Sequence, residues 1–348
     1  MKTKKNILVF GNFASISNVL CGQTVKTRNI HKLLKSKKST HFKSVKYFDT
    51  ENFQINKTSL LKGLKEVMKA DILYYLPAEN SLTYFFPIIY ILAKISATQI
   101  HFVVVGGWLD QRIKNMPVHI WMLRNVKKIY PQTNDLCISL AKKYGYKNVV
   151  QLNNFRIHNF SAFATSTSNL IKLVFMARIH PAKGIETLFN LSKQLEKLKI
   201  ENVTIDMYGP ILTEYEAKFK SNLEEASSNI IYKGALNPNE IYGVLSNYDM
   251  LLFPTQYYTE GFPGSVLDAY IAGIPVIATD WQYASEFILQ NKSGIIVEFD
   301  NPEIFISTVI DTVQNTTLID SLKQGAAHMA QKYSANKAWE VLHQNLGN

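Results

Sequence analysis

The sequence predicts an α/β protein of two lobes, each a doubly wound parallel sheet with helices on both faces. Three observations predict this fold class. The chain has 348 residues, 47% of them hydrophobic, which is more than one core usually holds. Short apolar runs alternate with longer helical stretches along the chain. The alternation stops once, in the polar segment 153–169, and then restarts, which is typical of a linker between two domains.

The first lobe, residues 1–160, begins with an apolar run at residues 7–10 that we expect to be a buried strand. Further strands are predicted at residues 71–76, 100–105 and 149–152, with helices at about residues 26–36 and 135–144. The second lobe, residues 166–330, repeats the pattern. Its predicted strands are residues 172–177, 203–208, 230–234, 250–254 and 274–278, and its predicted helices are residues 185–198, 240–246 and 264–272. Helical spacing returns from residue 318.

Membrane and secretion segments are not expected. The apolar run after the basic start of the chain is too short for a signal core. The longest apolar segment, residues 84–93, contains Pro87 and is ended by Lys94. It has half of the roughly 20 residues that a spanning helix needs. The two cysteines, Cys21 and Cys137, show no metal-ligand spacing, which favours the reduced cytosol.

Charge is distributed unevenly along the chain. Residues 1–165 carry 25 Lys and Arg against 7 Asp and Glu, whereas residues 166–348 carry 13 against 20. This asymmetry suggests that the first lobe faces an anionic surface, although a lysine-rich solvated surface gives the same pattern. No nucleic-acid module accompanies the basic residues, so nucleic-acid binding ranks last. The histidines are scattered, and we expect no metal site.

The most informative segment follows the predicted strand 250–254. Glu260 stands in a turn, a helix is predicted to begin at Gly264, and Asp268 lies one helical turn further on. The N–H groups at a helix start form an anion site, and neighbouring glycines let a ligand approach. Carboxylates beside such a site can accept hydrogen bonds from sugar hydroxyls. Residue types alone allow a capped amphipathic helix with solvated carboxylates equally well.

A second segment follows the predicted strand 172–177. Arg178 and Lys183 are five positions apart, before a predicted helix. Two cations at this place could clamp a diphosphate and neutralise a leaving nucleotide. Taken alone, they could equally be surface charges.

Together these segments resemble retaining glycosyltransferases of family 4, which have the GT-B fold of two Rossmann-like lobes facing across a cleft. Glu260 and Asp268, eight positions apart around Gly-Phe-Pro-Gly, are similar to the acid-x7-acid signature of that family. The usual second Glu is Asp268 here, and Pro263 interrupts the usual Glu-Gly-Phe-Gly. Residues 178–184 resemble the Gly-Arg-x4-Lys-Gly element, with Ala177 in place of its first glycine.

The resemblance implies roles for these residues. Glu260, Arg178 and Lys183 would be catalytic, with Glu260 beside the donor sugar and Asp268 on the ribose. The implied donor-binding residues are Gly22, Gln23, Arg178, Lys183, Gly209, Glu260, Gly261, Phe262, Gly264, Ser265 and Asp268. Gly107, Trp108 and Asp110 would line the acceptor side, although loop punctuation explains them as well. A C-terminal helix, about residues 333–348, would pack back on the first lobe through Trp339, unless it is a plain terminal helix on the second lobe.

The predicted activity is metal-independent, retaining transfer of a sugar, from a UDP-sugar by preference, to a hydroxyl of a glycan or lipid-linked acceptor in polysaccharide biosynthesis. No cofactor is expected, and no Gly-x-Gly-x-x-Gly or Walker pattern is present. The basic first lobe predicts a cytoplasmic enzyme peripheral on the inner membrane face. The alternative is a catalytically silent GT-B protein that supports an active glycosyltransferase.

Overall fold

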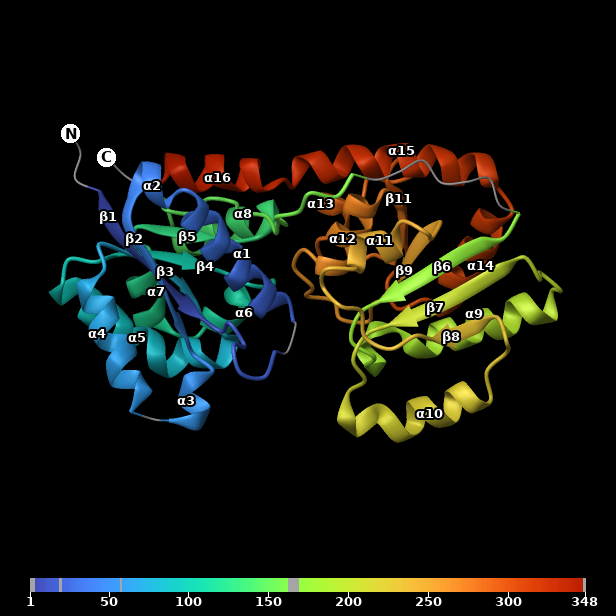
Figure 1. Cartoon of the computed structure of the whole chain (residues 1–348), viewed down its shortest axis with the longest axis horizontal. Helices are drawn as coiled ribbons and strands as arrows, with labels where there is room; N and C mark the ends of the chain where they lie inside the picture. Colours follow the sequence, from blue (N-terminus) through green and yellow to red (C-terminus); the bar gives the residue numbers. More distant parts are fainter. Residues whose placement is uncertain (1–3, 19–20, 57, 162–168, 347–348) are drawn as a thin grey trace. The chain divides into compact units, whose positions relative to one another are not determined.

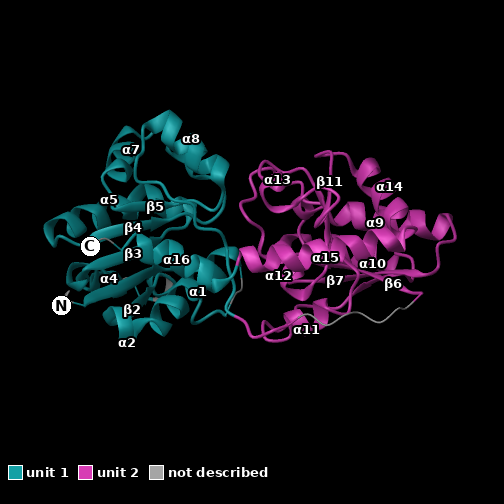
Figure 2. Ribbon diagram, turned by 90° about the horizontal axis from the view of Figure 1, so that it is seen from above, with its two compact units in different colours: residues 1–157, 334–348 teal, residues 158–333 magenta. Residues whose placement is uncertain are grey.

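The computed structural model describes residues 4–18, 21–56, 58–161 and 169–346. The chain forms two compact units, each with its own sheet (Figures 1 and 2). Unit 1 comprises residues 1–157 and 334–348, and unit 2 comprises residues 158–333. Residues 162–168 of the predicted linker lie outside the described residues.

Unit 1 is built on a five-stranded parallel sheet of order β2-β1-β3-β4-β5. Its strands are β1 (Lys5–Gly11), β2 (Phe42–Asp49), β3 (Ile72–Leu76), β4 (Gln99–Val103) and β5 (Lys128–Tyr130). Its helices are α1 (Gly22–Ser36), α2 (Lys38–His41), α3 (Asn52–Ile55), α4 (Ser59–Lys69), α5 (Glu79–Ile95), α6 (Leu109–Ile113), α7 (Pro117–Arg124), α8 (Asn134–Tyr144) and α16 (Ala335–Gln344). The helices pack on both faces of the sheet (Figure 1).

Alternate residues of the unit 1 strands contact different helices, as the two-residue period of a strand requires. Ile7 and Val9 belong to the same buried cluster as Leu34 of α1 and Leu342 of α16. Tyr75 of β3 points the other way and stacks on Phe86 of α5. The last helix of the chain is therefore part of the core of the first unit, and Trp339 packs at the edge of the same cluster.

Unit 2 is built on a six-stranded parallel sheet of order β11-β10-β9-β6-β7-β8. Its strands are β6 (Ile171–Met176), β7 (Val203–Tyr208), β8 (Ile230–Tyr232), β9 (Met250–Phe253), β10 (Val276–Thr279) and β11 (Gly294–Val297). Its helices are η1 (Pro181–Lys183), α9 (Ile185–Lys197), η2 (Thr213–Tyr215), α10 (Glu216–Glu224), α11 (Ile241–Leu245), α12 (Gly264–Ala272), α13 (Ala284–Phe287), α14 (Pro302–Val313) and α15 (Thr316–Lys332). The strand order reverses direction at the neighbours β6 and β9, where ligands of doubly wound sheets bind.

Three strands of the sheets, β2, β5 and β11, were not predicted, and one predicted strand is absent. β2 has lysines at positions 43 and 46 and lies at the edge of its sheet, so its apolar residues form no continuous run. β11 is a second edge strand of four residues. The predicted strand at residues 149–152 was wrong, because Val149 forms only an isolated bridge to Ile129.

Candidate active site

The predicted site residues of unit 2 lie at the carboxyl ends of neighbouring strands. Arg178 follows β6, and Glu260 follows β9, with which β6 pairs in parallel. Lys183 ends η1, the short helix between β6 and α9. Because the strands are parallel, these segments leave the same edge of the sheet, where doubly wound folds bind their ligands.

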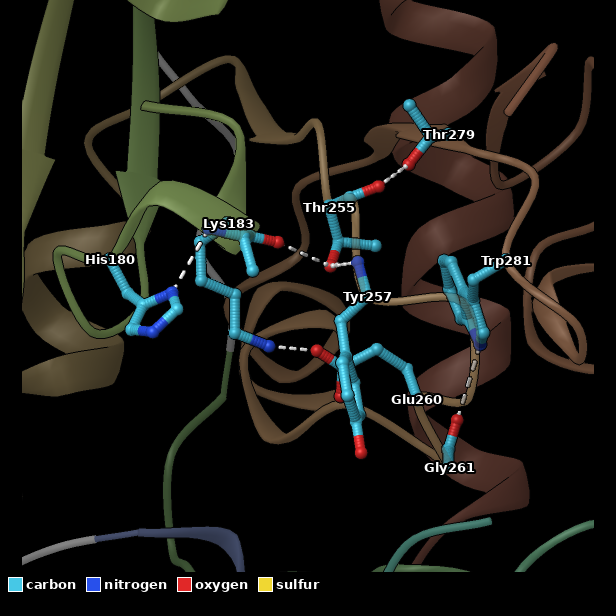
Figure 3. Close-up of polar contacts among 9 residues, drawn as sticks. His180, Lys183, Thr255, Tyr257, Glu260, Gly261, Thr279 and Trp281 are labelled. Atoms are coloured by element: carbon cyan, nitrogen blue, oxygen red, sulfur yellow. Dashed lines mark hydrogen bonds and ion pairs between the residues drawn. The ribbon is translucent and has the colours of Figure 1, made fainter. Parts of the chain in front are cut away.

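Lys183 and Glu260 form an ion pair across this edge (Figure 3). The Lys183 side chain is 23% exposed and the Glu260 side chain 15% exposed. The Nζ atom of Lys183 also lies 5.9 Å from the ring centre of Phe253 and 5.7 Å from that of Tyr257. The ammonium group is thus placed between a carboxylate and two aromatic faces, which both favour a cation. The sequence analysis missed Tyr257, although it lies three residues before Glu260.

The electrostatics of the site are set by burial and by a second cation. Burial lowers the pKa of Lys183 to about 8, and the positive charge of Arg178 acts in the same direction. Arg178 itself is exposed at the end of β6. Two neighbouring cations are suited to an anionic ligand, because the ligand's charge offsets the repulsion between them.

Close backbone packing fixes the loop that carries Lys183. The N–H of Gln256 donates to the carbonyl of Ala182 at 2.9 Å, which ties η1 to the segment after β9. The N–H of Ala182 donates to Nδ1 of His180 at 3.0 Å (Figure 3). Gly184 has a φ of +75°, and a Cβ there would lie 1.9 Å from the carbonyl oxygen of Pro254. The Lys-Gly pair therefore combines a cation with the one residue type that permits this approach.

The end of β7 is packed equally closely against the end of β6. Gly209 has a φ of +143°, and a Cβ there would lie 1.8 Å from the carbonyl oxygen of Ala177. Ile179 forms a parallel bridge to Ile211 beyond both strands. The absence of a side chain at Gly209 thus lets the end of β7 lie against the backbone next to Arg178.

The Gly-Phe-Pro-Gly segment is anchored in the core of unit 2. The ring of Phe262 is buried, stacks on Phe287 at 4.1 Å and contacts Tyr333 at 4.5 Å. Nε1 of Trp281 donates to the carbonyl of Gly261 at 3.3 Å (Figure 3). The Phe262 side chain therefore positions the turn from inside the core, and the backbone around it is what remains to face a ligand.

Helix α12 follows this turn. It begins at Gly264, with Pro263 at its N-cap position and no side-chain cap among the residues that the structure describes. Gly264 and Ser265 are half-buried. Asp268, one turn further on, is only 5% exposed and accepts a hydrogen bond from the hydroxyl of Tyr242 at 3.3 Å. The N-terminal turn of α12 can attract an anion through its N–H groups, while Asp268 is held in place by a tyrosine that the sequence analysis missed.

In unit 1, the predicted residues Gly22 and Gln23 open helix α1. Gly22 is exposed, with nothing within 4 Å of a Cβ built there, and Nε2 of Gln23 donates to the carbonyl of Leu76 at 3.4 Å. Both therefore lie at the carboxyl edge of the unit 1 sheet, next to the end of β3.

Two carboxylates that the sequence analysis did not identify shape the loop before α1. Asp49, at the end of β2, accepts hydrogen bonds from the N–H groups of Phe13 and Ser15, both at 2.9 Å. Glu51 accepts hydrogen bonds from the N–H groups of Ile16 at 2.8 Å and of residue 17 at 3.1 Å. Burial alone would raise the pKa of Asp49, but the N–H donors outweigh it and hold this pKa below its ordinary value. Successive N–H groups of this loop thus point at fixed negative charge.

The predicted acceptor-side residues follow β4. Gly107 is buried, and Nε1 of Trp108 donates to the carbonyl of Val105 at 2.6 Å. The carboxylate of Asp110 accepts hydrogen bonds from Lys143 at 2.5 Å and Tyr144 at 3.0 Å. Burial would raise the pKa of Asp110, but these donors hold it below its ordinary value. Asp110 thus ties α6 to α8, which is a structural task that does not depend on an acceptor.

Two absences hold for the part of the chain that the structure describes. No group of three or more His, Cys, Asp or Glu side chains is placed to hold a metal ion within those residues. None of the helices within them combines the length and the apolar character needed to cross a bilayer.

Comparison with known proteins finds a family model that matches the part of the chain holding the site. The family model described as Glycosyl transferases group 1 matches residues 158–329, which is nearly all of unit 2. This segment contains the four charged residues of the candidate site, Arg178, Lys183, Glu260 and Asp268. The fold of the chain is α/β GT-B, with two Rossmann-like parallel sheets, as predicted. The family match and the relatives below support a glycosyltransferase of group 1.

Particular relatives agree with this class. The chain is 25% identical over 210 residues to the poly(ribitol-phosphate) alpha-N-acetylglucosaminyltransferase of Staphylococcus aureus, covering 58% of this chain and 40% of that protein. It is 27% identical over 182 residues to the lipopolysaccharide 1,2-N-acetylglucosaminetransferase of Salmonella typhimurium, covering 50% and 46%. The alignments thus span less than half the length of these two relatives. The structure of Alr3699/HepE from Anabaena, solved with UDP and glucose, has a TM-score of 0.75 at 13% identity and covers 98% of this chain and 99% of that one.

Proposed function

We propose that this protein transfers a sugar from a nucleotide diphosphate sugar, preferably a UDP-sugar, to a hydroxyl of a glycan or lipid-linked saccharide acceptor, with retention of anomeric configuration. The observation that carries the proposal is the Lys183–Glu260 pair at the carboxyl edge of the unit 2 sheet, with Arg178 beside it. UDP is favoured because the Anabaena neighbour was solved with UDP and glucose. By their names, the two relatives transfer N-acetylglucosamine to poly(ribitol phosphate) and to lipopolysaccharide, and the second of these supports a lipid-linked saccharide acceptor.

In this proposal unit 2 binds the donor. Arg178, Lys183 and the Gly264–Ser265 helix start stabilise negative charge as the bond between the sugar and the diphosphate breaks. These groups supply the positive charge that the leaving diphosphate needs, so the proposed reaction is metal-independent. When a diphosphate takes over Lys183, its partner Glu260 becomes available to accept hydrogen bonds from sugar hydroxyls.

The proposal assigns further donor contacts to residues around the Lys183–Glu260 pair and to the start of α1. Asp268, held by Tyr242, would accept hydrogen bonds from the ribose hydroxyls. The backbone at Gly209, Gly261 and Phe262 would line the diphosphate, because their side chains are absent or turned to the core. Gly22 and Gln23 of unit 1 would approach the donor through the start of α1.

Unit 1 is proposed to receive the acceptor near Gly107, Trp108 and Asp110. We further propose that the enzyme is peripheral on the inner face of the cell membrane, in keeping with its basic unit 1 and with a lipid-linked acceptor. A catalytically silent supporting role is the second candidate. The site residues of unit 2 weigh against it, since a silent protein has no need for the largely buried Lys183–Glu260 pair.

Thermal unfolding with UDP, GDP and ADP, and with their sugar conjugates, tests the donor class directly. Binding to the folded state raises the melting temperature with ligand concentration. We expect UDP compounds to stabilise the protein and Arg178→Ala to abolish the effect, while Lys197→Ala, an exposed lysine of α9, leaves it unchanged.

Sugar transfer tests the enzymatic part of the proposal. Glu260→Gln should bind UDP but lose most turnover, whereas Glu225→Gln, at an exposed position after α10, should keep it. Normal turnover in Glu260→Gln would refute the role of Glu260. UDP binding with no hydrolysis or transfer in the unmodified protein would favour the supporting role.

A further inference from the structure

Helix α5 of unit 1 is apolar on its exposed side as well as on its buried side. Its buried side contacts the sheet through residues such as Phe86. Its exposed side presents Tyr84, Ile88, Ile91 and Ile95, which lie one above another at helical spacing. Tyr84 is 76% exposed and Ile95 71% exposed. A helix that is apolar all round is normally buried, so this stripe calls for a further contact.

The neighbouring helices extend the stripe. Leu61 and Met68 of α4 and Val118 and Trp121 of α7 are also exposed. The ring of Trp121 packs against Tyr90 of α5 at 5.7 Å. The three helices lie in one layer on the sheet, with α5 in contact with both others (Figure 1). We call their outer surface the α4–α5–α7 face. It carries eight of the nineteen large apolar side chains that are exposed among the described residues.

The charges around this face are predominantly positive. Its exposed cations are Lys62, Lys65, Lys69, Lys94, Lys114 and Arg124. Its two carboxylates are Glu66, which is paired with Lys46 and Lys69, and Glu79 at the start of α5. A patch of neighbouring exposed apolar side chains that is rimmed by charged residues marks an interaction site.

We propose that the α4–α5–α7 face docks on the surface of a bilayer that contains anionic lipids. Isoleucines enter the acyl boundary, and Trp121 and Tyr84 suit the headgroup level, where amphipathic rings gather. Lysines at the margin keep their ammonium groups in the headgroups and meet the lipid phosphates. The choice of a membrane as the partner rests on the proposed function. This inference deepens that function by assigning the membrane contact to helices α4, α5 and α7.

A second copy of the chain fits this face less well. A two-fold interface would bring the same patch from both copies together, and the basic margins would then face each other. An anionic bilayer, in contrast, supplies the complementary charge for the whole margin.

The lysine-rich segment 32–46 belongs to a different part of unit 1. It spans the end of α1, α2 and the edge strand β2. Leu34 of α1 packs in the cluster of Val9, whereas Phe86 of α5 packs on Tyr75, whose side chain leaves the sheet on the other side. The end of α1 and helix α5 therefore lie on different faces of the sheet, although Lys46 of the edge strand β2 reaches Glu66 of α4. The α4–α5–α7 face has lysines of its own at its margin, so contact with anionic lipids there does not require segment 32–46.

Sedimentation with vesicles of phosphatidylcholine, with and without phosphatidylglycerol, tests the proposal on the full chain. The Ile91→Gln/Ile95→Gln variant should bind anionic vesicles at least about tenfold more weakly, because two exposed apolar groups lose their transfer energy. Lys65→Gln should weaken binding about fivefold at low salt. The matched controls are Lys35→Gln/Lys38→Gln in the other segment and Leu198→Gln, an exposed apolar residue of unit 2, and both should bind like the parent.

Brominated lipids give a direct reading of position. They should quench tryptophan emission in the parent protein, and the quenching should disappear in Trp121→Phe. No binding by the parent, undiminished binding by Ile91→Gln/Ile95→Gln, or loss in the Lys35/Lys38 control would overturn the proposal. So would a dimer in gel filtration that Ile91→Gln/Ile95→Gln dissociates. The variant should keep its melting temperature and its response to UDP, which separates failure of this surface from failure of the donor site.

Discussion

Replacing Lys183 by methionine tests how charge is used at the donor site. Methionine keeps a flexible side chain but removes the ammonium group, so Glu260 loses its ion-pair partner. Since both side chains are largely buried, water screens their interaction little. In the proposed complex the substitution removes the contact between Lys183 and the diphosphate. A hydrogen bond to a charged group contributes about 1.5–3 kcal/mol, so we expect UDP affinity to fall by about ten- to hundredfold.

The pH dependence gives a sharper test, because two properties should change in opposite directions. The pKa of Lys183 is lowered to about 8 from its ordinary value of 10.5. Above pH 8 the ligand-free site loses the positive charge of Lys183, so UDP affinity should fall by up to about tenfold per pH unit. Between pH 8 and 10.5 the unfolded chain holds the Lys183 proton more tightly than the folded chain. The contribution of Lys183 to the free energy of unfolding should therefore rise with pH in this window.

Titration calorimetry with UDP at about pH 7 and about pH 9.5 measures the first effect, and urea unfolding at the same pH values measures the second. Lys183→Met should bind weakly at both pH values. Lys183→Arg is the matched control, because arginine stays charged and should remove the pH dependence while retaining part of the affinity. Equal UDP affinity of the parent at both pH values, or the same pH slope in Lys183→Met, would refute this reasoning.

Three further predictions concern stability. Lys26 is fully buried in unit 1, and burial lowers its pKa to about 7. In urea unfolding, the free energy of unfolding of the parent should therefore rise relative to that of Lys26→Met between pH 7 and 10.5. A difference between the two proteins that stays constant with pH would contradict this. Gly184→Ala should lower the free energy of unfolding by more than about 1 kcal/mol, whereas Gly243→Ala, in open space on α11, should not lower it. Equal melting temperatures of the two variants would show that Gly184 is not constrained. Asp110→Asn should lower the free energy of unfolding by about 1–3 kcal/mol at neutral pH, because the ionised carboxylate, whose pKa is lowered by its donors, stabilises the fold above pH 4. Urea unfolding should show that this loss disappears in acid, and an unchanged free energy of unfolding at neutral pH would contradict the prediction.

Much of unit 2 could be predicted because its site residues adjoin the strands in the sequence. Arg178 lies two residues after β6, and Glu260 lies in the loop between β9 and α12. Apolar strands that are buried on both faces form visible runs, so the ends of β6 and β9 could be located from composition. The contacts of Asp268 with Tyr242 and of Lys183 with Tyr257 could not be predicted in this way, because they depend on side-chain directions within folded loops.

Unit 1 was harder to predict because its important contacts join distant segments. Asp49 and Glu51 are 34–36 residues from the loop whose N–H groups they bind. They follow β2, which itself escaped prediction because lysines interrupt its apolar residues. One signal was present: two of only seven acidic residues in the basic first lobe stand two positions apart. Acidic residues that are rare in a basic lobe, such as Asp49 and Glu51, are therefore a signal of function or structure even where no motif contains them.

The two carboxylates also bear on how the loop before α1 can act. Backbone N–H groups in successive turns usually serve an external anion, and a loop after the first strand of a Rossmann-like sheet is a common place for one. Here the N–H groups of Phe13, Ser15 and Ile16 are already bound to Asp49 and Glu51. An incoming phosphate would have to displace carboxylates that are fixed in the same unit and repel it. The loop is therefore suited to hold the start of α1 in place, and the cations that an anionic donor needs are those of unit 2.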